Sequence, residues 1–247
     1  MIGISFNKKE FEYDAYTLVK AFYPKEDIEM YGTWEEEGPK DYEKLVSISY
    51  GDRVVIGVHT REHTLEDSAP YDEKEDRKKR KNTLKQILYK LLVQETGQTL
   101  PWGNLTGIRP VKIAMGLIEE GMTNAQAADF MRKTYFTSNE KTALAIAIAN
   151  RERDILKDID YKRGYSLYVG IPFCPSICLY CSFSSSPLEK WRDRVEDYLT
   201  ALLKELDFIS QAMKDRPLNT IYIGGGTPTT LEPDQLRRLL GHIQECF

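Results

Sequence analysis

The sequence predicts an α/β fold in two parts, an α+β region over residues 1–160 and two βα units over residues 165–247. The second part runs strand, helix, strand, helix, which is the order of a parallel α/β sheet. The first part mixes short alternating strands with amphipathic helices, the second half being helical. Between the two parts, the periodicity lapses over residues 158–164, so we expect a linker there. A chain of 247 residues has room for one large domain or two smaller ones.

The first part contains short strands and longer helices. Gly51-Asp52 suits a tight turn between two strands. One long helix begins in a run of charges, ends near Gly97 and carries its apolar face in its second half. Thr123 and Ser138 suit helix N-caps. In chain order, we expect strands over residues 2–6, 45–50 and 53–59, and helices over residues 13–22, 73–95, 110–120, 124–133 and 138–157.

In the second part, each βα unit combines a short apolar run with a longer amphipathic stretch. We expect strands over residues 165–171 and 218–223, and helices over residues 191–213 and 233–246. Parallel α/β folds place their chemistry at the carboxyl ends of the strands. The segments that follow the two strands are therefore the first places to look for a site.

Composition and charge narrow the function classes. The chain is 41% hydrophobic and 29% charged, as is ordinary for a globular protein in water. No run approaches the roughly 18–20 apolar residues of a membrane span. Residues 1–8 lack the charged head and apolar stretch of a signal peptide, so we expect a cytoplasmic protein with no membrane partner. The net charge of −4 argues against nucleic acid as the main partner.

Three of the four cysteines lie within eight residues, directly after the first strand of the second part. Cys174, Cys178 and Cys181 have the spacing C-x3-C-x2-C. Thiolates are soft donors that suit an iron–sulfur cluster. Three of them leave one iron of a 4Fe–4S cluster without a protein ligand, open to a cofactor that carries an amine and a carboxylate. We therefore predict that these cysteines are metal ligands.

A zinc site and a metal-free packing role stay open as alternatives for these cysteines. Structural zinc takes four Cys or His ligands, commonly in paired C-x2-C groups. No fourth ligand lies near in the sequence, where the histidines are His59, His63 and His242. Free cysteines are also common in protein cores. Cys246, at the end of a predicted helix and without a partner motif, is expected to pack in this way.

A glycine-rich segment, Gly224-Gly225-Gly226-Thr227-Pro228, follows the second strand. Glycines let a backbone approach a ligand closely and adopt positive φ angles. The segment is not a Walker loop, because no Gly-Lys-Ser/Thr follows, and the Gly-x-Gly-x-x-Gly dinucleotide fingerprint is absent. Its place one βα unit after the cysteines makes it a candidate cofactor-binding segment.

Together these motifs resemble the radical S-adenosylmethionine (SAM) superfamily and, within it, the oxygen-independent coproporphyrinogen III oxidase-like branch of the HemZ type. The resemblance rests on C-x3-C-x-Tyr-C with Gly-Gly-Gly-Thr-Pro, on residues 168–174 (Tyr-Val-Gly-Ile-Pro-Phe-Cys) and on residues 105–110 (Leu-Thr-Gly-Ile-Arg-Pro). It implies the start of a radical SAM (β/α) partial TIM-type barrel behind an α+β N-terminal domain. Two βα units are fewer than a barrel needs. We therefore expect a truncated core that shows no substrate turnover alone.

The resemblance also implies roles for single residues. Cys174, Cys178 and Cys181 would bind a 4Fe–4S cluster, reduced by an electron donor protein. The residues that would contact SAM are Tyr168, Tyr180, Gly225, Gly226 and Thr227. A 5′-deoxyadenosyl radical from SAM would abstract hydrogen from a propionate of a porphyrinogen. Loss of carbon dioxide and an electron would then leave a vinyl group, as haem biosynthesis requires of coproporphyrinogen III.

Two positions depart from this branch. Its oxidases typically have His where this chain has Gly170, and Cys where it has Phe183. Relatives with Phe at the second position include haem-trafficking proteins on the same scaffold. A haem chaperone, or a radical SAM enzyme with another substrate, therefore stays open as an alternative.

Two groups of basic and aromatic residues in the first part suit more than one role. Residues 77–81 (Arg-Lys-Lys-Arg-Lys) suit a nucleic-acid patch, but four acids shortly precede them, which favours a solvated helix face. A zinc-stabilised module that grips RNA is the corresponding third hypothesis. Trp102, Arg109 and Lys112 suit contacts to an anionic substrate such as a porphyrin propionate, and suit capping and surface packing nearly as well.

Overall fold

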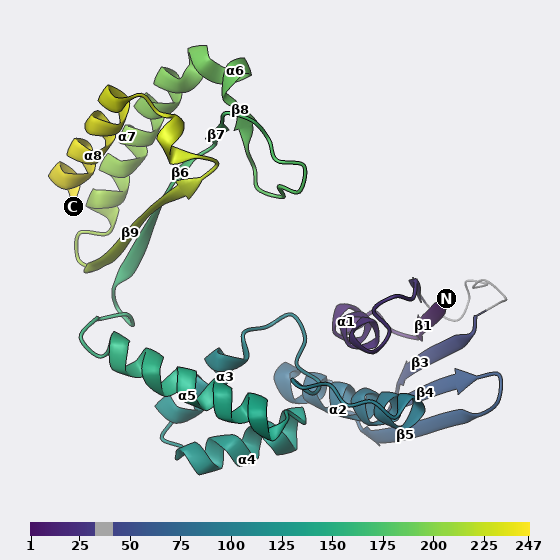
Figure 1. Cartoon of the computed structure of the whole chain (residues 1–247). Helices are drawn as coiled ribbons and strands as arrows, with labels where there is room; N and C mark the ends of the chain where they lie inside the picture. Colours follow the sequence, from purple (N-terminus) through teal and green to yellow (C-terminus); the bar gives the residue numbers. More distant parts are fainter. Residues whose placement is uncertain (33–41) are drawn as a thin grey trace. The chain divides into compact units, whose positions relative to one another are not determined.

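The computed structural model describes residues 1–32 and 42–247, which divide into two units, residues 1–154 and 155–247 (Figure 1). Both units contain helices and strands, so the mixed α/β class that the sequence predicts is confirmed. Among the helices that the structure describes, none combines the length and the apolar character needed to cross a membrane.

A five-stranded sheet forms the first half of unit one. In spatial order its strands are β2 (Ile28–Tyr31), β1 (Ile2–Phe6), β3 (Lys44–Tyr50), β4 (Arg53–Thr60) and β5 (Thr64–Pro70). The strand β1 is parallel to both neighbours, whereas β4 is antiparallel to both β3 and β5. The predicted turn at Gly51 and Asp52 joins β3 to β4.

Two helices, α1 (Glu12–Phe22) and α2 (Arg77–Thr96), pack their apolar residues against this sheet. Alternate residues of β3, such as Ile48, are buried with Leu88 of α2 in one core. The second helix begins at Arg77 rather than near residue 73, because the Asp76 carboxylate caps it by accepting the Lys79 amide at 3.1 Å.

The sequence pattern does not predict the two edge strands, β2 and β5. Within residues 1–32 and 42–247, each pairs with a neighbouring strand on one side only. Of the central residues of β5, Glu66 and Asp67 are exposed, and charged side chains on an edge keep it from pairing with other chains. A strand without a buried face lacks the apolar alternation by which strands are read from sequence.

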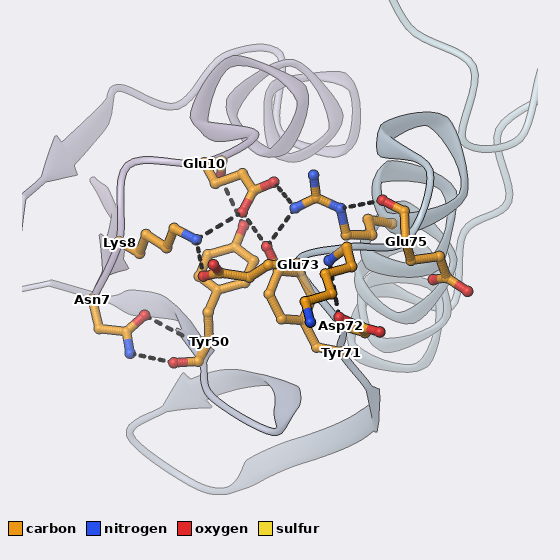
Figure 2. Close-up of polar contacts among 10 residues, drawn as sticks. Asn7, Lys8, Glu10, Tyr50, Tyr71, Asp72, Glu73 and Glu75 are labelled. Carbon is orange, nitrogen blue, oxygen red and sulfur yellow. Dashed lines mark hydrogen bonds and ion pairs between the residues drawn. The ribbon is translucent and has the colours of Figure 1, made fainter.

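A cluster of charged and aromatic side chains ties the ends of these elements together (Figure 2). Arg80 of α2 forms an ion pair with Glu10, which lies between β1 and α1, and donates to the Tyr71 hydroxyl at 2.8 Å. The Tyr50 hydroxyl donates to the Glu10 backbone carbonyl at 2.6 Å. The side chains of Arg80 and Glu10 are only 13% and 14% exposed. The basic run at residues 77–81 is therefore not wholly solvated, because Arg80 is part of the fold.

Three helices complete unit one. They are α3 (Pro110–Glu119), α4 (Asn124–Tyr135) and α5 (Asn139–Leu156). Small side chains such as Ala114, Ala127 and Ala145 let them pack closely in a core of their own. Both predicted N-caps are present: Thr123 forms a capping box with Gln126, and the Ser138 hydroxyl accepts the amide of Lys141 at 3.2 Å.

A buried lysine joins α2 to the segment before α3. The ammonium of Lys85, a residue 7% exposed, donates to the Thr106 hydroxyl at 2.9 Å. The same hydroxyl lies 2.9 Å from that of Thr17 on α1. Burial lowers the pKa of Lys85 to about 8. The segment over residues 105–110 is thus fixed on both sheet-covering helices.

Unit two consists of two βα units whose strands pair in parallel. β6 (Tyr165–Ile171) pairs with β9 (Leu218–Gly225), and α7 (Val195–Ala212) and α8 (Pro233–Cys246) pack side by side (Figure 1). Val169 of β6 is buried against both helices in one core. The predicted helix over residues 191–213 is divided, with a short α6 (Leu188–Trp191) and a 3₁₀ turn before α7.

We predict that the free energy of unfolding rises between about pH 8 and pH 10.5. In this window Lys85 binds fewer protons in the folded chain than in the unfolded chain, so raising the pH disfavours unfolding, by at most about 3 kcal/mol. Urea unfolding at pH 8, 9 and 10 measures the rise. Lys85→Met should flatten it, whereas Lys90→Met, on an exposed position of the same helix, should not. An equal rise in Lys85→Met would contradict the prediction.

Candidate functional site

The candidate site begins where β6 ends. The chain continues into β7 (Phe173–Cys174), runs out through residues 175–185 and returns in β8 (Ser186–Pro187), which pairs with β7. The amide of Ser186 donates to the carbonyl oxygen of Pro172 at 2.7 Å and closes the base of this loop. All three clustered cysteines are free thiols: Cys174 is buried, Cys181 is half-buried and Cys178 is exposed.

The three thiols do not converge as the ligands of a single ion would. Zinc–sulfur bonds of about 2.3 Å in a tetrahedron put two sulfur atoms roughly 3.8 Å apart. In the described part of the chain, the sulfur atoms of Cys174, Cys178 and Cys181 do not all lie within 4.8 Å of one another. A 4Fe–4S cube takes its ligands at separate corners, which lie further apart. The donor set, three soft thiols on one loop, is of the kind that holds an iron–sulfur cluster.

The glycine segment at the end of β9 lies directly against the first of these cysteines. The amide of Gly226 donates to the Ile171 carbonyl at 2.7 Å, and the amide of Thr227 donates to the Phe173 carbonyl at 2.8 Å. The Thr227 hydroxyl lies 3.5 Å from the sulfur of Cys174, although the two residues are 53 apart in sequence. The two segments selected by their motifs therefore form one site.

Two of the glycines are required by this geometry. Gly225 has a φ of 98°, which side chains of L-residues disfavour. A Cβ atom on Gly226 would lie 2.6 Å from the Phe173 carbonyl oxygen and 2.8 Å from the Cys174 sulfur. Only a residue without a side chain lets the backbone approach the thiol so closely. The segment thus makes a close-fitting wall beside whatever Cys174 holds.

Two tyrosines, one from β6 and one from β9, lie against Gly224 at the start of this segment. Tyr168, 61% exposed, stacks on Tyr222 with ring centroids 5.6 Å apart. Tyr180, in the cysteine loop, is 90% exposed. Nothing in the sequence motifs singled out Tyr222. The signal for it is the strand register, which pairs Tyr222 of β9 with Tyr168 of β6.

A pocket of about 310 Å³ opens beside the same strand end. Gly170, Phe183 and Tyr198 line it together with Tyr168 and Gly225. The Tyr198 hydroxyl, on α7, donates to the Gly170 carbonyl, and burial raises the pKa of Tyr198, which keeps this hydroxyl protonated. Gly170 and Phe183, the two positions at which we expect the chain to depart from the oxidases, therefore line one pocket.

The fourth cysteine lies between α7 and α8. The thiol of Cys246 donates to Asp207 Oδ1 at 3.5 Å, and His242 Nε2 lies 2.9 Å from the same oxygen. Burial and the Asp207 carboxylate raise the pKa of the Cys246 thiol. These three side chains lie within 4.8 Å of one another. Among the described residues, the Cys246 thiol is hydrogen-bonded to Asp207 and His242 Nε2 forms no hydrogen bond, so Cys246 is a partner of Asp207 and not a member of the cysteine loop.

Trp102, Arg109 and Lys112 are the residues of unit one that the sequence analysis selected for contacts to an anionic substrate, and they differ from one another in their surroundings. Trp102 packs against the core of the three helices, with the Lys141 ammonium 5.8 Å from its ring centre, so packing accounts for it. Arg109 and Lys112, at the start of α3, are exposed and line a pocket of about 450 Å³.

A protein of Bacillus subtilis (strain 168), the oxygen-independent coproporphyrinogen-III oxidase-like protein HemZ, is similar to this chain over most of the chain's length. The two are 34% identical over 221 residues, which are 85% of this chain and 44% of HemZ. The chain belongs to the oxygen-independent coproporphyrinogen III oxidase-like family. It spans less than half the length of this relative.

Oxidases and chaperones are both similar to this member of the family over a shorter stretch. The oxygen-independent coproporphyrinogen III oxidase of Pseudomonas aeruginosa is 40% identical over 80 residues, 32% of this chain and 17% of the oxidase. The heme chaperone HemW of Bacillus subtilis is 41% identical over 82 residues, 33% of this chain and 21% of HemW. No protein-family model and no solved structure matches the chain. Identity alone therefore does not separate an oxidase from a chaperone.

We predict that Gly226→Ala exposes Cys174 in the metal-free chain. The added methyl group cannot fit between the Phe173 carbonyl and the thiol, so one of them must move. In the unchanged chain, iodoacetamide should modify exposed Cys178 first and buried Cys174 last. In Gly226→Ala, peptide mass spectrometry should find Cys174 modified several-fold faster. Gly241→Ala, where a Cβ meets open space, is the control. An unchanged rate at Cys174 would contradict the contact.

Proposed function

We propose that this chain is the cluster-binding and cofactor-binding part of a radical SAM enzyme of porphyrin metabolism. The observation that carries the proposal is the contact between Cys174 and the segment Gly226–Thr227, which joins the two motifs into one site. The proposed architecture is an α+β domain over residues 1–160, followed by the first two βα units of a partial TIM-type barrel. The parallel pairing of β6 and β9 supports it.

In this proposal, Cys174, Cys178 and Cys181 hold a 4Fe–4S cluster and leave one iron open. The exposed position of Cys178 and the turn in which the Cys181 amide donates to the Cys178 carbonyl at 3.0 Å let the loop close around a cube. The bound cluster supplies the electron, received from a donor protein, that cleaves SAM.

The glycine segment and the tyrosines bind the cofactor in this proposal. The amides of Gly226 and Thr227 already donate to the β6–β7 backbone, so the group that Gly226 offers a ligand is its carbonyl oxygen. A carbonyl oxygen suits an ammonium, such as the methionyl amine of SAM. Tyr168 and Tyr180 offer exposed aromatic surfaces to the rest of the cofactor.

The proposed substrate is coproporphyrinogen III, which the names of the relatives specify for them. The proposed reaction is the oxidative decarboxylation of its propionates to vinyl groups. This assignment is separate from the cluster site and has its own test. Because the chain alone is expected to show no substrate turnover, the test uses a chimera in which this chain replaces the matching part of Bacillus subtilis HemZ. If the assignment holds, the reconstituted chimera should form more 5′-deoxyadenosine from SAM when coproporphyrinogen III is added. If 5′-deoxyadenosine formation does not change when the porphyrinogen is added, coproporphyrinogen III is not the substrate. The proposed cluster site would be unaffected by that result.

A haem chaperone on the same scaffold is the second candidate function. The observation that favours it is that Gly170 and Phe183 line one pocket, which therefore lacks the histidine and cysteine of the oxidases. A haem-binding role predicts that the chain binds haem with a Soret shift, and that Phe183→Ser weakens the binding. Gly170→His with Phe183→Cys should then lower haem affinity and raise the response to coproporphyrinogen III.

We predict that anaerobic reconstitution of the chain with iron and sulfide gives a brown protein with about four irons per chain. Cys174→Ala, Cys178→Ala and Cys181→Ala should each lose most of the iron and the visible absorbance. Cys246→Ala, whose thiol bonds to Asp207, is the matched control and should keep both. A colourless protein with one zinc per chain, or iron that survives all three loop substitutions, would overturn the proposal.

A further inference from the structure

Residues 105–110 are anchored to helices α1 and α2 on one side and exposed to solvent on the other. Thr106 is held by Lys85 and Thr17, through hydrogen bonds of 2.9 Å to each. The next residue, Gly107, turns the chain with a φ of 65°. Ile108 is 51% exposed, and Arg109 is exposed as well. The anchored segment thus presents an apolar side chain and a guanidinium to solvent at neighbouring positions.

These two residues border the pocket of about 450 Å³ in unit one, which α2, α3 and α4 line as well. Phe130 and Leu117 belong to its apolar lining. A volume of this size falls within the range of small-molecule sites, about 300–1,000 Å³. The pocket is therefore large enough for the body of an organic ligand, and its apolar lining suits a body that is itself apolar.

The charges that line this pocket are mostly positive. The lining includes three cations, Lys78, Arg109 and Lys112, and one carboxylate, that of Glu120. Within residues 1–32 and 42–247, none of the three cations forms an ion pair. Unpaired cations around an apolar pocket favour a ligand with at least two negative groups, and the guanidinium of Arg109 can bind a carboxylate through two parallel hydrogen bonds.

We propose that this pocket binds an apolar small molecule with two or more carboxylates, and specifically a tetrapyrrole with propionate side chains. Apart from the four charged side chains, the hydroxyl of Tyr135 is the polar side-chain group of this lining, which leaves the several polar edges of a sugar and a base with few partners and disfavours a nucleotide. The choice of a tetrapyrrole rests on the proposed function, whereas the choice of an apolar polycarboxylate rests on the pocket alone. Lys78, which belongs to the basic run at residues 77–81, would contact the ligand in this site.

Gly116 offers a direct test, because it lines the pocket and a Cβ there meets nothing within 4 Å. Gly116→Leu should fill the pocket without straining α3, since leucine is the better helix former. Gly241→Leu, at an equally open helical position on α8, is the matched control. The ligand used is coproporphyrin III, the stable oxidised tetrapyrrole, titrated into the metal-free chain and followed by porphyrin fluorescence.

The expected result is saturable binding that Gly116→Leu weakens at least about tenfold and Gly241→Leu leaves unchanged. Arg109→Gln with Lys112→Gln should raise the Kd roughly tenfold, the effect of two partly exposed ion pairs. Added salt should weaken binding to the unchanged chain more than to this double variant. Circular dichroism checks that each variant is folded.

Equal binding by Gly116→Leu and the unchanged chain would overturn the proposal, as would the absence of saturable binding. Reconstituting Gly116→Leu with iron and sulfide shows whether a loss of porphyrin binding is accompanied by a loss of the cluster. A variant that assembles a full cluster but does not bind coproporphyrin supports the pocket. A chain that assembles no cluster and still shows pocket-dependent binding refutes the proposed function and retains this inference.

Discussion

The parallel pairing of β6 with β9 is the constraint on which the candidate site depends. Its register sets Ile171 opposite Gly225, so both strands end at the same edge. Only then do the amides of Gly226 and Thr227 reach the carbonyls of Ile171 and Phe173. The pairing is held by the apolar face of β6, which α7 and α8 bury. The contact between the cysteine loop and the glycine segment thus depends on the hydrophobic packing behind β6.

Much of this framework could be read from the sequence, because it follows from local patterns. The apolar run of β6 and the apolar stripe of α8 predict both elements with the bounds that the structure has. The cysteine and glycine motifs could be placed after strands for the same reason. The contact between Gly226 and Cys174 could not, because it depends on the register of two strands far apart in sequence.

The roles of other residues could not be predicted from the sequence, because their contacts form only when the chain folds. Tyr198 reads as one more apolar position on a helical stripe, yet its hydroxyl bonds to the Gly170 carbonyl. Tyr222 reads as a strand residue, yet it stacks on Tyr168. The basic run at residues 77–81 reads as a solvated face, yet Arg80 is half-buried in an ion pair with Glu10. In each case a tertiary contact decides the role of the side chain.

In the proposed site, the cluster and the sulfonium cofactor are bound together. Electron paramagnetic resonance of the reduced, reconstituted chain, recorded with and without SAM, can show whether they are. We expect a reduced 4Fe–4S signal whose g values shift when SAM is added, because the iron without a protein ligand would bind the amine and the carboxylate of SAM. An identical cluster signal with and without SAM would mean that the two are not bound in one site.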